Sequence, residues 1–199
     1  LLSLQIKIST CWSWKESSIL IMKYFDELKK AMNFLAENKK TIFIGQAVEV
    51  PGTAMSNTLK EINPKKLLEL PVAEEMQMGI TAGLALDGNI PVSIFPRWNF
   101  LLLAINQLVN HIDKINIMSR NEYKFKAIIR TGIGSQRPLH PQHQHIGDFT
   151  DQVKNMCTSI DVIKLNEPED IFPSYEKALN RSDGKSTLLV EYSDYYNEK

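Results

Sequence analysis

The sequence predicts an α/β domain with a mostly parallel sheet of about six strands and helices on both faces. Short apolar runs alternate along the chain with amphipathic helical patterns. Several of these runs are apolar on both faces, as buried parallel strands are. The 199 residues, 43% of them hydrophobic, suit one domain with a single sizeable core. Ligands of such sheets bind at the carboxyl ends of strands, so the loops after the strands are the candidate functional regions.

The first predicted elements are a helix and a strand. Large apolar side chains recur at helical spacing over 24–38, with Lys and Glu between them, and predict an amphipathic helix. A short apolar run at 41–44 predicts a strand that ends at Gly45. The next residues, 46–58, are small and polar and contain the turn signal Pro51-Gly52.

The rest of the chain continues the alternation. Apolar runs bounded by Gly, Pro, Asn or Asp predict strands at 67–70, 91–95, 125–130, 161–164 and 187–191. Longer amphipathic or apolar segments predict helices at 75–86, 99–118, 149–157 and 168–180. Asn99 is expected to cap the longest of these helices. Thr131-Gly132-Ile133-Gly134 is expected to end the fourth strand and to begin a loop over 131–147 that is rich in Gly, Pro and His.

Composition narrows the classes of function. Lys plus Arg and Asp plus Glu number 23 each, so the formal net charge is zero and nothing indicates binding to nucleic acid or to an acidic membrane. No apolar run approaches the roughly 20 residues of a membrane span. Cys11 and Cys157 are too few for a disulfide framework and have no metal-site spacing, so we expect a reduced cytoplasmic setting.

The first 21 residues are expected to be separate from the domain. They lack the small-residue cleavage site of a signal peptide, and the chain begins with Leu. Met22 opens the first clean amphipathic pattern. We therefore expect 1–21 to be a leader or a non-native extension and 22–199 to be the folded domain. A native helical extension is the alternative.

Glu74 is the first candidate functional residue, because it follows a predicted strand and begins a predicted helix. An acid in a first helical turn is commonly explained by the helix dipole, and Glu75 fits that explanation equally well. Gly79 and Gly83 lie four residues apart on one face of the same helix, where they let another backbone approach. Each costs about 1 kcal/mol of helix propensity relative to Ala. We therefore expect a close contact of this face with the sheet or with a partner subunit.

The segment 95–100 places three aromatic residues between a predicted strand and a predicted helix. One interpretation is a hydrophobic staple around an Asn cap. The other is an aromatic wall for a planar heterocycle such as a pyrimidine ring.

Three histidines, His140, His143 and His145, occur within six residues of the loop that follows the fourth strand. Histidine is a common zinc ligand, but no carboxylate or thiolate is interleaved at a familiar spacing. An acid–base histidine is therefore favoured over a metal site, and a solvated loop is the plain alternative. Arg130 and Arg137 are further groups that could meet a carboxylate or a phosphate.

Taken in order, these motifs resemble the pyrimidine-binding domain of the transketolase-like thiamine-diphosphate enzymes. The resemblance covers the chain from about Met22 to the last strand and is strongest to the beta subunit of the decarboxylating component of 2-oxoacid dehydrogenases. The series that carries it is Leu70-Pro71-Val72-Ala73-Glu74, Gly79 and Gly83, Pro91-Val92-Ser93-Ile94-Phe95, the run from Asn99 to Leu108, and Pro141-Gln142-His143.

The resemblance implies a role for individual residues. Glu74 corresponds to the glutamate that activates the cofactor, and Val72 to an aliphatic residue of the thiamine pocket. Phe100 corresponds to the aromatic side chain that lies against the aminopyrimidine. His143 corresponds to an active-site histidine that faces the substrate or the acyl acceptor.

Two positions depart from the family pattern. Pro96 stands in the cofactor pocket where the beta subunits usually have Met, so that part of the wall is altered. Gln46 stands where they usually have Glu, which puts a proton relay at this position in doubt.

The cofactors that the resemblance implies are thiamine diphosphate and Mg²⁺. Thiamine becomes nucleophilic when its thiazolium ring loses the C2 proton. In this family a carboxyl group hydrogen-bonded to the pyrimidine favours the imino tautomer, whose nitrogen removes that proton. A dry, apolar pocket favours the protonated form of a carboxyl group, and Val72 and Phe100 are expected to contribute to such a pocket.

The family motif that holds the diphosphate and Mg²⁺, Gly-Asp-Gly with a later Asn, has no counterpart here, because Asp87-Gly88 follows Leu86 and a predicted helix. We therefore expect no metal ligands in this chain and an alpha-type partner chain that binds the diphosphate, in an α2β2 assembly. The expected reaction is decarboxylation of a 2-oxoacid, or two-carbon or acyl transfer from a ketose-type donor. The alternatives are a cofactor-free scaffold or regulatory subunit, which Gln46 and Pro96 favour, and a metal-dependent hydrolase that uses the three histidines.

Overall fold

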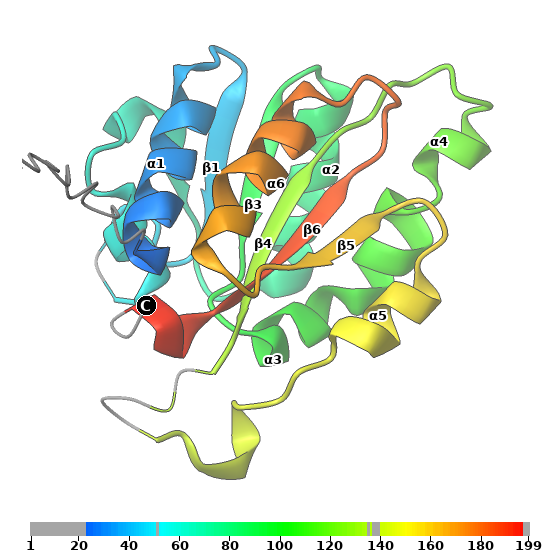
Figure 1. The fold of residues 1–199 in the computed structure, drawn as a ribbon. Coiled ribbons are helices and arrows are strands. Elements are labelled where there is room, and N and C mark those ends of the chain that lie inside the picture. Colours follow the sequence, from blue (N-terminus) through cyan, green and yellow to red (C-terminus); the bar gives the residue numbers. More distant parts are fainter. Residues whose placement is uncertain (1–22, 51, 135, 137–139, 197–199) are drawn as a thin grey trace, which may run out of the picture.

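Six strands form one parallel sheet in the order β2-β1-β3-β4-β6-β5 (Figure 1). The computed structural model describes residues 23–50, 52–134, 136 and 140–196, so the expected leader lies outside the described residues. Each strand is hydrogen-bonded to its neighbours in parallel. The strands are β1 (Thr41–Gly45), β2 (Leu67–Glu69), β3 (Ile90–Ile94), β4 (Ile128–Ile133), β5 (Asp161–Lys164) and β6 (Thr187–Tyr192). The predicted fold class is confirmed.

Helices cover both faces of the sheet. The α-helices are α1 (Tyr24–Glu37), α2 (Glu74–Leu86), α3 (Trp98–Leu101), α4 (Ile115–Met118), α5 (Thr150–Met156) and α6 (Pro168–Asn180). The 3₁₀ and π turns are η1 (Met55–Leu59), η2 (Pro64–Lys66), η3 (Leu102–Ala104), η4 (Gln107–Ile112), η5 (Gln142–Gln144) and η6 (Ser193–Tyr196). Figure 1 shows α1 and α6 side by side on one face, and α2, α3 and α5 on the other. No helix in the described part of the chain has both the length and the apolar character needed to cross a membrane.

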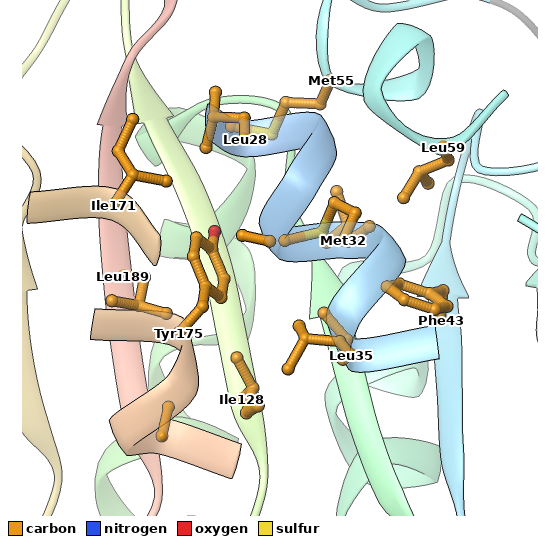
Figure 2. Packing of buried hydrophobic residues seen from close by; sticks show 14 of the residues in the cluster. Leu28, Met32, Leu35, Phe43, Met55, Leu59, Ile128, Ile171, Tyr175 and Leu189 are labelled. Atoms are coloured by element: carbon orange, nitrogen blue, oxygen red, sulfur yellow. The ribbon is translucent and has the colours of Figure 1, made fainter. Parts of the chain in front are cut away.

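The two faces have separate hydrophobic cores. On the first face, Leu28 and Met32 of α1 and Tyr175 of α6 pack on Ile128 and Leu189 of the sheet (Figure 2). The second core joins α2, α3, α5 and η4 to the alternate side chains of the same strands. Because both faces of the central strands are buried, they need the continuous apolar runs that the sequence contains.

The fourth strand differs from its prediction. It begins at Ile128 rather than at residue 125 and continues through Gly132 to Ile133. A Cβ on Gly132 would lie 2.7 Å from Ser193 Oγ and 2.9 Å from Met55 Cε. This glycine therefore allows a close approach of neighbouring segments and does not break the strand. The chain turns away at Gly134, where φ is +83°.

The predicted helix over 99–118 is also wrong in detail. Arg97 occupies the N-cap position, and Asn99 lies inside α3. The helical path then tightens into the 3₁₀ turn η3, widens into the π turn η4 and ends with α4. These changes of pitch keep Leu101, Leu108 and Ile112 in the second core, which a uniform 3.6-residue repeat had not anticipated.

The glycine face of α2 does not pack on the sheet, so that part of the prediction is wrong. The helix contacts the second core through Met78 and Ala85. Gly79 and Gly83 are on its exposed side, where a Cβ on either would meet no described atom within 4 Å. The alternative, contact with a partner subunit, stays a prediction.

Candidate functional site

Glu74 is the first residue of α2 and lies near the carboxyl ends of β1 and β2. Its side chain is 5% exposed. Gln46 Nε2, from the residue after β1, donates a hydrogen bond to Glu74 Oε1 at 3.2 Å. Within the described residues, this is the only hydrogen bond recorded for the Glu74 carboxyl group. A carboxyl group can accept more bonds than this, so Glu74 retains capacity for a ligand.

Buried polar bonds dock α2 on the sheet and thereby place Glu74. Gln77, one helical turn after Glu74, donates from Nε2 to Ile94 O at 2.9 Å and to Ser93 Oγ at 3.1 Å. Thr81 Oγ1 lies 2.9 Å from the same Ser93 hydroxyl. Gln77 was not among the residues predicted from the sequence. The signal that could have found it is a polar residue on the buried stripe of the helix, where an unsatisfied amide would be costly.

Glu69 organises the loop that carries Gln46. Its carboxylate accepts hydrogen bonds from the backbone N–H groups of Ala47, Val48, Glu49 and Val50, at 2.5, 2.8, 2.7 and 3.3 Å. Burial alone raises the pKa of Glu69, but the four N–H donors outweigh it and hold the pKa below the ordinary value. The loop is thus held by an anion from within the chain.

A cavity of about 900 Å³ lies at the same edge of the sheet, lined by residues of α1, of the segment 52–61 and of the segments that follow β3, β4 and β6. Its lining includes Pro96, Arg97, Phe100 and His145. The rings of Phe100 and His145 are in contact, with centroids 5.4 Å apart, and Arg97 donates to the His145 carbonyl at 3.3 Å. Burial lowers the pKa of Arg97, and Asp194 opposes this effect. Pro96 and Phe100 therefore line the same cavity.

The predicted pocket around Glu74 is not assembled by this chain alone. Glu74 does not line the cavity that contains Phe100. Val72 is 73% exposed, so it does not enclose Glu74 either. The cofactor-binding roles of Val72, Pro96 and Phe100 stay predictions that require a further surface opposite this edge.

Two histidines of the loop after β4 lie in different surroundings. His143 is exposed in η5, whereas His145 lines the cavity. His145 Nδ1 is buried and has no hydrogen-bond partner among the described residues. The catalytic role of His143 stays a prediction, and His145, one of the three histidines noted in the sequence but given no role by the resemblance, becomes a second candidate. No three His, Cys, Asp or Glu side chains in the described part of the chain could hold a metal ion together, so the hydrolase alternative has no support.

Arg130 does not face a ligand. It is fully buried and forms a bidentate ion pair with Glu191, and its Nη1 donates to Thr58 Oγ1 at 2.8 Å. Tyr175 and Tyr196 donate to the same carboxylate. Arg130 therefore joins β4 to β6 and η1, and the expectation that it could meet a substrate anion is wrong. Arg137 lies outside the described residues.

The family model described as the transketolase pyrimidine-binding domain matches residues 22–197. Among curated relatives, a pyruvate dehydrogenase E1 component subunit beta from Gracilaria tenuistipitata var. liui is 31% identical over 124 residues, which are 60% of this chain and 38% of the relative. A 2-oxoisovalerate dehydrogenase subunit beta from Bacillus subtilis is 25% identical over 118 residues, 57% of this chain and 36% of the relative. The chain thus matches well under half of the length of these relatives.

Solved structures show the same fold. A split-gene transketolase, described as an inactive beta4 tetramer, matches with a TM-score of 0.64 and 20% identity, over 84% of this chain and 50% of that one. A 2-oxoglutarate:ferredoxin oxidoreductase from Magnetococcus marinus matches with a TM-score of 0.60 and 10% identity, over 87% of this chain and 29% of that one.

Proposed function

The chain belongs to the transketolase pyrimidine-binding domain family, and we propose that it is the pyrimidine-binding subunit of a split thiamine-diphosphate-dependent enzyme. The reaction is decarboxylation of a 2-oxoacid, or two-carbon or acyl transfer from a ketose-type donor. The enzyme works only when a partner chain supplies the surface opposite the carboxyl edge of this sheet.

The observation that carries the proposal is the state of Glu74. It is buried, held by the Gln46 amide through one oxygen, and placed at the carboxyl edge by α2. Bound thiamine diphosphate supplies a carbon acid that becomes a nucleophile. A carboxyl group that keeps one oxygen for a ligand is what the pyrimidine end requires. Phe100 and Pro96, which line the cavity at the same edge of the sheet, are the proposed apolar surface for the ring.

The partner surface is the exposed side of α2. Val72 and Met76 are 73% and 43% exposed, and Gly79 and Gly83 lie on the same side without a neighbour in the described chain. Apolar and small residues here suit close packing of another helix. We assign the partner as an alpha-type chain that carries the diphosphate and Mg²⁺, in an α2β2 assembly, because both curated relatives above are named beta subunits.

The cavity beside Phe100 is the proposed entrance for the donor substrate. Lys60 and Arg97 line it, and Lys29 in the same lining is ion-paired with Glu61 at 2.6 Å. This lining suits a substrate that carries a carboxylate or a phosphate. We place the enzyme in the cytoplasm, although a relative from Pisum sativum is named as mitochondrial. The proposed ligands are small molecules, and neither nucleic acid nor a membrane is a proposed partner.

The test is binding and turnover by the co-expressed complex. Thiamine diphosphate with Mg²⁺ should bind in a calorimetric titration. Glu74→Gln should lower kcat by about 100-fold or more, the range of a positioned acid or base, whereas Glu75→Gln at the neighbouring exposed position should not. Near wild-type turnover by Glu74→Gln would disprove the catalytic assignment.

The scaffold alternative is the other outcome of this test. It rests on Gln46 and Pro96, yet Gln46 contacts Glu74 and Pro96 lines the cavity, so neither departure removes the site. Absence of cofactor binding by a complex that assembles would favour the scaffold.

A further inference from the structure

The loop after β1 contains a strained backbone turn that a carboxylate from another strand holds. Ala47 has φ +54°, in the left-handed region that a residue with a Cβ rarely occupies. Four consecutive N–H groups, from Ala47 to Val50, converge on the Glu69 carboxylate at the end of β2. Bonds from N–H groups to a carboxylate are stronger than neutral ones, so Glu69 stabilises the strained turn.

Gln46 immediately precedes this turn, and the direction of the Gln46 side chain depends on the conformation of the turn. The backbone N–H of Ala47 is held by Glu69 Oε1 at 2.5 Å, which fixes the peptide unit that joins Gln46 to Ala47. From this position Gln46 Nε2 reaches Glu74 Oε1. Glu69 and Glu74 are thus linked through one short segment of the chain, residues 46 and 47.

An amide at position 46 has a chemical consequence for Glu74. The amide N–H donates at any pH and carries no charge that would repel the carboxylate. When Glu74 is protonated, the oxygen that accepts from Gln46 is occupied as an acceptor. The proton is then carried by Oε2, and this O–H group can donate a hydrogen bond to a ligand.

We propose that Gln46 is a positioning residue that holds Glu74 by Oε1 and directs its proton to Oε2, and that Glu69 holds Gln46 in place through the loop 47–50. This inference rests on the proposed function of Glu74 and adds the residues that orient it. Gln46 touches neither cofactor nor substrate in this assignment. In this proposal, Gln46 in place of the usual Glu of the family is compatible with an active site.

The contact itself is tested in the full chain without partner or cofactor. In ¹⁵N-edited NMR spectra, Glu74→Gln should shift the side-chain amide signals of Gln46, and the exposed control Glu75→Gln should not. Glu69→Gln should shift the backbone N–H signals of residues 47–50 and the Gln46 side chain together. If the side-chain amide signals of Gln46 do not shift in Glu74→Gln, the inference is overturned, independently of any measurement of enzyme activity.

The functional consequence is tested in the co-expressed complex. Gln46→Met keeps the size of the side chain but removes the donor, so kcat should fall by about 3- to 10-fold, the value of one hydrogen bond, while KM for the donor substrate stays the same. The near-ultraviolet circular dichroism of bound thiamine diphosphate should change as well. Gln152→Met, on the exposed side of α5, is the matched control and should change neither.

The outcomes separate this inference from the proposed function. If Glu74→Gln abolishes turnover but Gln46→Met changes neither kcat nor the dichroism, the positioning role is wrong and the proposed function stands. If Glu74→Gln is fully active, the proposed function fails, and the positioning role toward the cofactor fails with it.

Discussion

Two glutamates are buried near the carboxyl edge of this sheet, and their surroundings are opposite. Glu191 of β6 is fully buried and binds the Arg130 guanidinium through both oxygens, with the hydroxyls of Tyr175 and Tyr196 as further donors. Glu74 is 5% exposed, and Gln46 is its recorded partner within the described chain. Burial alone therefore does not distinguish the structural carboxylate of Glu191 from the proposed functional carboxylate of Glu74.

The number of partners does distinguish them. Burial and the Glu191 carboxylate raise the pKa of Tyr175 and of Tyr196 well above the ordinary value, so both hydroxyls remain donors. With these donors and Arg130, Glu191 has no capacity left, as expected of a buried ion pair that joins elements. Oε2 of Glu74 has no hydrogen-bond partner among the described residues, as the proposed ligand-binding role requires.

The largest expected effect is the difference in stability between Glu191→Gln and Glu74→Gln. Glu191→Gln leaves the buried Arg130 charge without its counter-ion and should lower the free energy of unfolding by about 3–5 kcal/mol. Glu74→Gln disturbs one hydrogen bond and should cost about 1 kcal/mol or less. Urea unfolding of the two variants measures both values. Equal losses would show that Glu74 is also a structural carboxylate.

The next effect sharpens the comparison at the backbone. Gly132→Ala places a Cβ against Ser193 and Met55, on the Glu191 side of the edge, and should cost about 1–3 kcal/mol by overpacking. Thermal unfolding of the full chain is the measurement. An unchanged melting temperature would mean that Ser193 and Met55 move aside without cost.

On the Glu74 side, glycine should be replaceable in the isolated chain. The methyl group added by Gly83→Ala would meet no described atom within 4 Å, so the substitution should stabilise α2 by about 1 kcal/mol. It should also weaken assembly with the partner chain, because the methyl group lies in the proposed interface. Gly88→Ala is the control, because that glycine is equally uncrowded but has φ +86°, so alanine should destabilise there. Denaturant unfolding tests stability, and sedimentation of the complex tests assembly. Unimpaired assembly of Gly83→Ala would remove the glycine face from the proposed interface.

The smallest expected effect is the pH dependence from Glu69. Its pKa is lowered in the folded state, so the stability it contributes is fully present above the ordinary Glu pKa of about 4.3 and is lost as the pH falls through the lowered value. Wild type should therefore be more stable than Glu69→Gln at neutral pH, and this advantage should shrink in acid. Thermal unfolding at a series of pH values measures it. An advantage that grows in acid would contradict the sign of the shift.

Much of the fold could be predicted from local pattern. The strand at 161–164 and the helix at 168–180 have the predicted bounds, because their apolar periodicity and flanking residues are local signals. The fourth strand was predicted to end at residue 130 because a glycine such as Gly132 is taken as a break unless the neighbours that crowd it are known. The helix after Arg97 was predicted as uniform because sequence spacing does not reveal a change of pitch.

The sequence by itself determined the α/β class, the family and the place of Glu74 after the second strand, since these depend on residues close together in the chain. Only the tertiary structure decided which polar groups meet. Gln46 and Glu74 are 28 residues apart, and Arg130 and Glu191 are 61 apart. Apolar periodicity specifies which face of an element is buried, but it carries no information on which distant donor will satisfy a buried acceptor. For that reason the sequence could name Glu74, whereas the Gln46 bond, the Glu69 loop and the cavity beside His145 required the fold.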